Sequence, residues 1–221
     1  MTGYLQNLME SLNFSALTDA LTRAAAVLLC LSVHETCHGL AALALGDPTA
    51  KERHRLSLNP LHHIDWLGLA LMFTAGFGWA KPVPVDPRYF KNPKGGMALT
   101  ALAGPASNFL LAVLAVLLAR VLFFLPLDGT VVTRIALFLA VDVAALSLGL
   151  GVFNLIPIPP LDGSKVLAAF LPERVWLVWM RFERYGMLVL LAVIILGWDG
   201  NFIPRAVFWL HQMLVGTFFA Q

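Results

Sequence analysis

The sequence predicts an all-α, polytopic transmembrane helical bundle with about five to six membrane segments. Of the 221 residues, 59% are hydrophobic and 13% are charged, whereas a soluble domain is about 25% charged. The apolar residues are gathered into long runs, most of which approach the roughly 20 residues that a helix needs to cross the hydrocarbon core. The longest polar stretches, 46–63 and 81–96, are under twenty residues each. We therefore expect one membrane domain without an inserted soluble domain.

Six apolar stretches account for the predicted membrane segments, and in chain order they are 17–45, 64–80, 97–125, 131–156, 175–196 and 202–219. All but the second have roughly the length and composition of a membrane-spanning helix. The second is marginal, because it contains three glycines and is bounded by Pro60 and Pro82, which favour an irregular backbone. We expect it either to cross the bilayer or to re-enter and leave on the same face.

The basic residues bear on the choice between these topologies. If the second stretch re-enters, one side of the membrane receives Lys51, Arg53, Arg55, Lys81, Arg88, Lys91, Lys94, Lys165 and Arg174, and the positive-inside rule makes that side cytoplasmic. The opposite loops, 126–130 and 198–201, carry aspartates and neither lysine nor arginine. We expect a multi-pass protein in the lipid bilayer of a cell membrane, of the prokaryotic plasma-membrane kind. The scattered basic residues and a net charge of only +2 argue against a nucleic-acid partner.

The first apolar stretch contains His34-Glu35-Thr36-Cys37-His38, the HExxH pattern. Histidines four residues apart project from one face of a helix and can bind one metal ion. The glutamate then lies beside the metal, where a carboxylate can take a proton from a water molecule activated by zinc. The pattern indicates a zinc peptidase. Its place in a membrane-length run is unusual, and ionisable residues at that depth are functional by default.

Two other interpretations of this helix stay open. His34 and His38 can serve only as polar contacts to neighbouring helices, although two histidines and a glutamate together are costly at membrane depth. Cys30 lies one helical turn before His34 and is either a thiolate ligand of the same metal or a small buried apolar side chain, which is the commoner case.

A catalytic zinc ion needs a third protein ligand and an open position for water, and Asp162 is the best candidate. It lies in the sequence NLIPIPPLDG at 154–163, where three prolines prevent a regular helix. Non-helical backbone at membrane depth is tolerated where it lines a cavity or is buried in protein. The alternative is that Asp162 and Gly163 only form a turn at the start of a helix.

These two motifs together resemble the site-2 protease family of intramembrane metalloproteases, in which an HExxH helix is followed by N-x-x-P-x-P-x-x-D-G. The sequence between them is similar to the small branch of that family that lacks a PDZ domain. The segments that carry the likeness are LGDPTA at 45–50, RLSLNPL at 55–61, HID at 63–65, GWAKPVPV at 78–85, NP at 92–93 and AGPASN at 103–108. The resemblance runs from about 26 to 171, some two thirds of the chain.

The resemblance implies a role for each residue of the two motifs. His34, His38 and Asp162 would bind one zinc ion, and Glu35 would activate the attacking water. Asn154 would bind the substrate backbone or the oxyanion through its amide, with a helix C-cap as the alternative role. The substrate would be a transmembrane protein or peptide that lies as an unwound strand against the proline-rich wall.

The predicted domain covers 1–221, with a catalytic core at about 17–171 and C-terminal transmembrane helices at about 175–219. No PDZ or nucleotide-sensing domain is recognised, so we expect the membrane core or separate partners to select the substrate. Two positions depart from the family pattern: His54 stands in place of a glycine and Trp66 in place of a proline. We expect these differences to affect loop shape more than chemistry.

Three further features have more than one interpretation. A non-proteolytic metal or proton transporter could use the same intramembrane histidines and aspartate as a pathway, but it would not require Glu35 beside the first histidine. His62, His63 and Asp65 either form a second metal or proton-relay site or stabilise a turn by local hydrogen bonds, and we expect the second. The segment 104–108 is predicted to be a kinked and closely packed helix entry.

Overall fold

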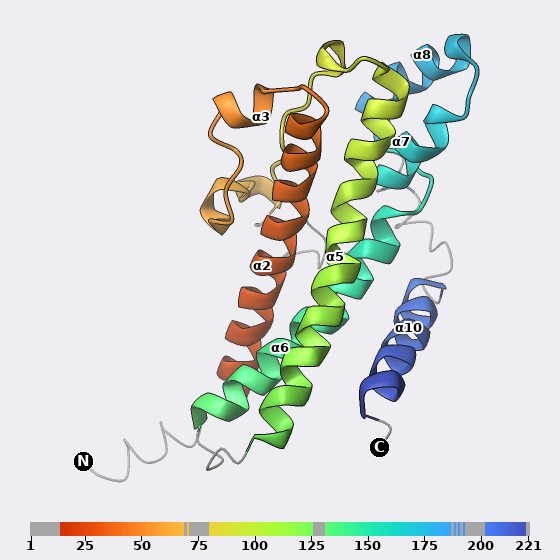
Figure 1. The fold of residues 1–221 in the computed structure, drawn as a ribbon. Helices are drawn as coiled ribbons and strands as arrows, with labels where there is room; N and C mark the ends of the chain where they lie inside the picture. Colours follow the sequence, from red (N-terminus) through yellow and green to blue (C-terminus); the bar gives the residue numbers. More distant parts are fainter. Residues whose placement is uncertain are drawn as a thin grey trace.

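The computed structural model describes residues 14–68, 70, 80–125, 131–186, 188, 190, 192 and 202–219. This part of the chain is helical, with three helices long and apolar enough to cross a membrane: α2 (Phe14–Ala44), α5 (Pro93–Phe124) and α6 (Val131–Asn154). The three pack side by side along much of their length (Figure 1). The predicted class, an all-α membrane bundle, is confirmed at this level.

The three long helices alternate in direction (Figure 1). α2 and α6 run one way and α5 runs the other, so the end of α2 and the start of α5 lie at the same end of the bundle. We call this end, with residues 45–68 and 80–92 that lie at it and along the adjoining part of α2 (Figure 1), the loop end. The start of α5 is well defined, because Oδ1 of Asn92 accepts a hydrogen bond from the backbone N–H of Gly95 at 3.1 Å and Pro93 occupies the first helical position.

Small side chains form the contact between α2, α5 and α6. Their shared buried cluster consists of Ala26, Cys30, Ala115, Val116, Val143 and Ala144. Small residues let membrane helices approach closely. The large apolar side chains instead point outwards, as Leu110, Leu114 and Val121 do on α5. Small residues inside and large apolar residues outside are what a bundle surrounded by lipid requires.

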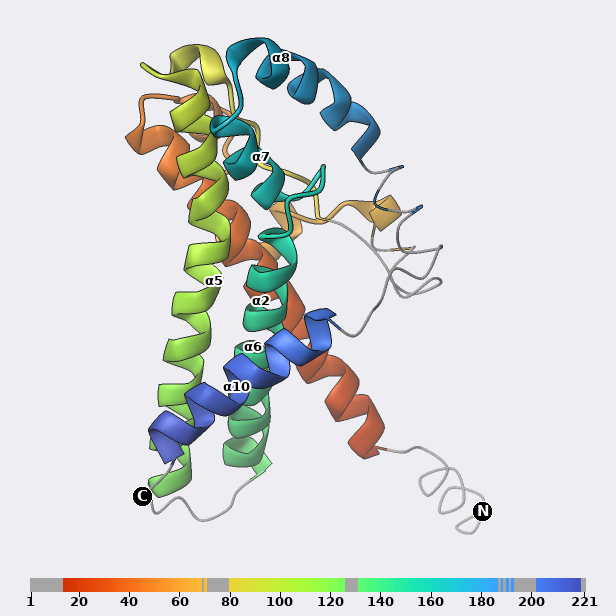
Figure 2. The same ribbon diagram turned by 90° about the vertical axis from the view of Figure 1, so that its right-hand side faces the viewer.

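The remaining elements are short or peripheral. Between α2 and α5 the loop end contains α3 (Thr49–Glu52), η1 (Pro60–His62) and η2 (Pro87–Tyr89), and after α6 come α7 (Asp162–Ala169), α8 (Glu173–Phe182), η3 (Glu183–Tyr185) and α10 (Phe202–Phe219). Figure 2 shows α8 at the loop end and α10 crossing α6 obliquely. Contacts of α10 with α5 and α6 hold it against the bundle.

The fifth and sixth apolar stretches are not confirmed as membrane spans. The first eight residues of the fifth, 175–196, belong to the ten-residue helix α8, which carries charged residues at both ends and buries none of its side chains. Such a helix suits an interface better than the bilayer core. The sixth corresponds to α10, which at 18 residues is not among the three candidate spans. Residues 187, 189, 191 and 193–201 lie outside the described residues, so the count of five to six spans stays a prediction.

The two ends of the second stretch, 64–80, are in contact. Ile64 and Ala80 form an isolated antiparallel bridge, and the backbone N–H of Lys81 donates to the carbonyl of His63 at 2.8 Å. A helix that crossed the hydrocarbon core would hold its two ends about 30 Å apart. Most of the stretch, 69 and 71–79, lies outside the described residues, but its described ends meet at the loop end.

Candidate metal centre

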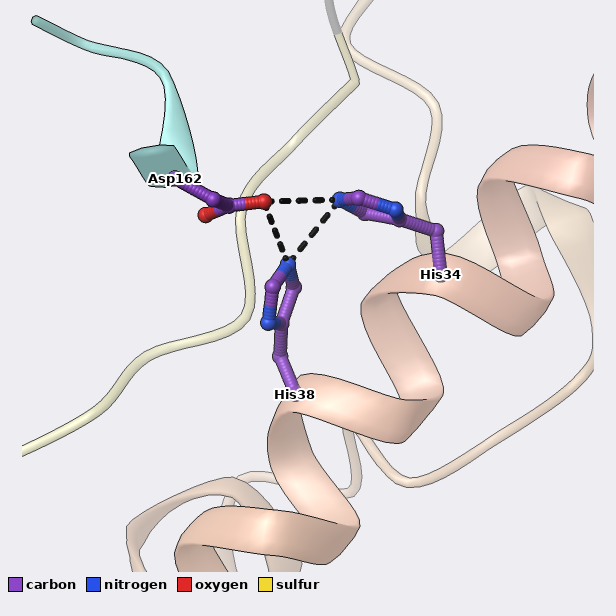
Figure 3. A group of neighbouring side chains, drawn as sticks. All are labelled: His34, His38 and Asp162. Atoms are coloured by element: carbon purple, nitrogen blue, oxygen red, sulfur yellow. Dashed lines mark hydrogen bonds and ion pairs between the residues drawn. The ribbon is translucent and has the colours of Figure 1, made fainter. Parts of the chain in front are cut away.

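His34 and His38 project from the same face of α2, one helical turn apart, and both are buried. Their Nε2 atoms lie 2.9 Å apart. Oδ2 of Asp162, the first residue of α7, lies 3.1 Å from each of them. Figure 3 shows the three donor atoms facing one another across a small gap. Three side chains that are far apart in the sequence therefore converge on one point.

The triangle of donor atoms has the size for a single metal ion. A tetrahedral zinc ion with bonds of about 2.0–2.1 Å holds its ligand atoms roughly 3.3 Å apart, and the three sides measure 2.9, 3.1 and 3.1 Å. Within the described part of the chain the group has these three members and no fourth His, Cys, Asp or Glu. The residues present therefore fit a catalytic metal site, which keeps one position open, better than a closed structural site.

The close packing of α7 sets the position of Asp162. The helix begins at Asp162 itself, directly after the irregular, proline-containing segment 155–161. Gly163 lies against the main chain of Leu155 and Ile156, and a Cβ at this position would overlap with their backbone atoms. The Asp-Gly pair does begin a helix, as the turn interpretation expected. Its carboxylate nevertheless faces the two histidines (Figure 3).

Helix α5 forms the wall behind the two imidazole rings. Nδ1 of His38 donates to the carbonyl of Thr100 at 2.7 Å. Gly104 lies so close to the rings that a Cβ there would overlap with His38 and come within 2.7 Å of Cε1 of His34. The fully buried Asn108 places its amide 3.1 Å from Nδ1 of His34. Outer contacts of this kind orient metal-binding histidines.

These outer contacts were missed by the sequence reasoning. The segment 104–108 is closely packed, as predicted, but we did not expect Thr100 and Asn108 to contact the histidines. The usable signal was their spacing: Thr100, Gly104 and Asn108 are four residues apart and so lie on one stripe of a helix. Two polar residues and a glycine on one stripe of a membrane helix point to a polar partner across the interface.

A cavity of about 380 Å³ opens beside the three donor atoms. It is lined by all five residues predicted for the site, which are His34, Glu35, His38, Asn154 and Asp162. Oε2 of Glu35 accepts a hydrogen bond from the backbone N–H of Val83 at 2.9 Å. Asn154 is the last residue of α6, and its Nδ2 donates to the carbonyl of Leu150 at 3.0 Å. Asn154 therefore makes a hydrogen bond at the end of α6 and also lines the cavity.

Cys30 packs away from this site. Its Sγ lies 3.1 Å from Oγ of Ser147 on α6, and its side chain belongs to the buried cluster between the helices. It is not a member of the group that could hold a metal. Of the two interpretations of Cys30, the small buried side chain is the correct one.

The polar residues near the second stretch form local hydrogen bonds, as expected. Nε2 of His63 lies 2.6 Å from the carbonyl of Ser57, and Oδ1 of Asp65 accepts from the backbone N–H groups of Leu67 and Gly68 at 3.0 Å each. They make no second metal site, because the group of two histidines and Asp162 is the one that the described residues place to bind a metal.

An HExxH helix and a distant aspartate that share one metal position among membrane-length helices define a membrane metallopeptidase. Comparison with known proteins leads to the same class. The sequence model of peptidase family M50 matches residues 129–197, which include Asn154 and Asp162. The chain is also 36% identical over 171 residues to a Bacillus subtilis (strain 168) protein named "Putative zinc metalloprotease YwhC", an alignment that covers 76% of this chain and 78% of the relative.

Two mycobacterial relatives, both named "Putative zinc metalloprotease Rip2", extend the likeness. The protein of Mycolicibacterium smegmatis is 30% identical over 187 residues, which cover 82% of this chain and 70% of the relative. That of Mycobacterium tuberculosis (strain H37Rv) is 28% identical over 192 residues, covering 84% and 71%. No solved structure matches the chain. The chain belongs to peptidase family M50, the site-2 protease family, and is a metalloprotease.

Proposed function

We propose that this protein is a zinc-dependent endopeptidase that cuts peptide bonds of transmembrane proteins inside the bilayer or at its edge. The observation that carries the proposal is the convergence of His34, His38 and Asp162, with donor atoms 2.9–3.1 Å apart, inside a bundle of membrane-length helices. The names of the relatives support zinc as the metal. Membership of a peptidase family favours hydrolysis over the transporter alternative.

In this proposal His34, His38 and Asp162 are the metal ligands. A bound zinc ion would lower the pKa of a coordinated water to near 7 and polarise the substrate carbonyl. The hydrogen bond from Nδ1 of His38 to Thr100 keeps the ring proton on Nδ1 and leaves Nε2 free to bind the metal. The carboxylate of Asp162 supplies a negative charge that the buried cation requires.

Glu35 is the proposed general base. It follows His34 directly on α2 and lines the cavity. The backbone N–H of Val83 donates to Oε2 at 2.9 Å, which restrains the carboxylate and leaves its second oxygen to accept a proton. Val83 lies between two prolines in the irregular segment 81–86, so this donor belongs to a stiff stretch of backbone.

Asn154 is the proposed substrate-binding residue. Its Nδ2 donates to Leu150, and an amide has a second N–H and a carbonyl oxygen to offer to a substrate backbone or to the oxyanion. The cavity wall around it includes apolar side chains such as Val85, Met97 and Met180. Such a wall suits the side chains of a transmembrane segment.

The depth of the site agrees with cleavage near one membrane face. His38 lies six residues before the end of α2 at Ala44, or about 9 Å at 1.5 Å per residue. This is about a third of the thickness of the hydrocarbon core. The metal position therefore lies a short distance inside the bilayer from the loop end, and a transmembrane substrate would be cut near that membrane face.

The proposal includes a topology in which the second stretch, 64–80, re-enters the membrane and leaves at the loop end. The contact between Ile64 and Ala80 supports it, as does the antiparallel pairing of α2 with α5 (Figure 1). The nine basic residues named in the sequence analysis lie at or beside the loop end, whereas Arg23, Arg120 and Arg134 lie toward the opposite end. This distribution makes the loop end cytoplasmic. With α10 and the part of the fifth stretch that follows α8 as further segments, the chain would have five to six in a cell membrane.

The decisive experiment uses the full chain in lipid vesicles with zinc and a transmembrane substrate. Glu35→Gln is expected to lower cleavage at least about 100-fold while each chain still binds one zinc ion. Glu52→Gln, at an exposed glutamate on α3, is the matched control and should cleave like the wild type. Unchanged cleavage by Glu35→Gln would show that Glu35 is not the base.

The ligands are tested separately by metal content. His34→Ala and Asp162→Ala are each expected to lose the bound zinc, measured by elemental analysis of protein purified in detergent. A variant that keeps a full equivalent of zinc would remove that residue from the ligand set.

A further inference from the structure

A second pocket lies at the loop end and is separate from the catalytic cavity. Its volume is about 530 Å³, and its walls are the turn after α3, η1 with the residues that follow it, and Lys81. It shares no lining residue with the catalytic cavity. α3 and η1 both contact α2, and Figure 1 shows α3 on the side of α2 that faces away from α5. We call this site the basic pocket, because it is lined by Arg53, His54, Arg55, His62 and Lys81.

Acidic residues neutralise only part of the positive charge in the basic pocket. Among the described residues, no carboxylate lies within ion-pair distance of Arg53, Arg55 or Lys81. The one acid in the lining is Asp65, whose Oδ1 already accepts two backbone hydrogen bonds at 3.0 Å. Nη2 of Arg55 donates to the carbonyl of Lys81 at 2.8 Å and so ties the two walls together. Three cations against one carboxylate leave a formal excess of two positive charges, and a concave site with such an excess attracts an anion.

The rim of the basic pocket is apolar and exposed. Trp66 is 75% exposed and Leu61 is 69% exposed, and both line the pocket. The nearby Leu58 is 61% exposed. Tryptophan and leucine beside basic residues at the end of a membrane helix are typical of the headgroup region of a bilayer. A small soluble anion would leave these side chains uncovered, whereas the glycerol and acyl chains of a lipid would cover them.

We propose that the basic pocket binds the headgroup of an anionic phospholipid. The phosphodiester lies between Arg53 and Lys81, because a guanidinium and an ammonium group both donate strong hydrogen bonds to phosphate oxygens. The glycerol backbone and the first part of the acyl chains pack on Leu61 and Trp66. The assignment holds for either orientation of the chain, since both faces of a membrane carry headgroups. It goes beyond the proposed protease activity and does not depend on it.

Native mass spectrometry of the full chain, released from detergent after incubation with defined lipids, tests this site without a protease assay. Phosphatidylglycerol is expected to stay bound and phosphatidylcholine to be lost. Arg53→Gln/Lys81→Gln should bind phosphatidylglycerol about 30-fold more weakly, since each interfacial cation contributes roughly fivefold to the attraction for an anionic lipid. Arg53→Lys/Lys81→Arg keeps both charges and should keep the lipid.

The matched control removes two exposed cations at the same end of the protein but outside the pocket. Lys91→Gln/Arg174→Gln has the same net charge as Arg53→Gln/Lys81→Gln, and it should bind phosphatidylglycerol like the wild type. Equal losses in the two pairs would show a general surface attraction and overturn the proposal. Equal retention of the two lipids would also overturn it. So would displacement of the lipid by millimolar inorganic phosphate, which would assign the pocket to a soluble anion.

Discussion

Asn108 on α5 places its side-chain amide 3.1 Å from Nδ1 of His34, while Nε2 of the same ring faces Asp162. A neutral histidine that binds a metal through Nε2 carries its proton on Nδ1, and this proton needs an acceptor. Oδ1 of Asn108 is buried without a partner, and a half turn of the amide brings it to Nδ1. Asn108 is therefore the acceptor that orients His34 toward the metal position.

Replacement of Asn108 tests this orientation. Asn108→Leu keeps the branched shape of the side chain but has no acceptor, and we expect it to bind zinc about 10–100-fold more weakly. Asn108→Asp keeps an acceptor and should bind zinc with nearly wild-type affinity. Competition with a chromogenic chelator measures both affinities. Equal losses in the two variants would mean that Asn108 only fills space behind the ring.

Gly104 offers a steric test of the same wall. A Cβ at this position would overlap with His38 and crowd His34, and overpacking of this kind costs about 1–3 kcal/mol. We expect Gly104→Ala to displace the rings, to lower zinc affinity by roughly 10–100-fold and to reduce cleavage in parallel. Gly216→Ala on α10, where the new Cβ meets nothing within 4 Å, is the matched control. If the two variants bound zinc equally well, α5 would not pack against the imidazoles as described.

The proposed orientation in the membrane predicts which positions a thiol reagent can reach. Lys91 lies at the loop end and Val132 near the opposite end, and both are exposed. In intact cells a membrane-impermeant reagent is expected to label Val132→Cys, and Lys91→Cys only after the membrane is broken. The wild type, in which Cys30 is buried and Cys37 partly so, gives the background. The reverse pattern would mean that the loop end is extracytoplasmic.

His54 occupies a backbone conformation that favours glycine. Its φ is 53°, and the turn after α3 is closed by hydrogen bonds from the N–H of His54 to Lys51 at 3.0 Å and from that of Arg55 to Ala50 at 2.9 Å. Helices commonly end through a left-handed glycine with this pair of bonds. The structure therefore explains why the family pattern favours glycine at this position.

His54→Gly is expected to stabilise the protein by about 0.5–1 kcal/mol, because relief of the left-handed strain exceeds the entropy that a glycine loses on folding. The melting temperature in detergent should rise accordingly. Arg53→Gly, one residue earlier at a φ of −88°, relieves no strain and should lower the melting temperature. A lower melting temperature for His54→Gly would contradict the turn geometry.

The success of the sequence reasoning depended on how local each feature is. The shared face of His34 and His38 follows from helical periodicity, and Asp162 could be chosen because prolines mark an irregular segment that membrane depth makes costly. The role of Asn108 could not be predicted, because hydrophobicity and spacing do not say which face of α5 meets α2. The fifth apolar stretch was predicted as one span, yet its first eight residues belong to α8, in which Glu173, Arg174 and Arg181 favour an interface.

By itself the sequence determined the membrane class, the three long helices and the pair of motifs that carry the chemistry, because these depend on composition and on the repeat of a single helix. Three contacts could be seen only in the folded chain: Asp162 meets the two histidines, α5 supports their rings, and the ends of the 64–80 stretch touch. Those contacts join residues far apart in the chain. The contacts around the histidines and Asp162 depend on how closely the chain can approach at Gly104 and Gly163, a distance that packing sets.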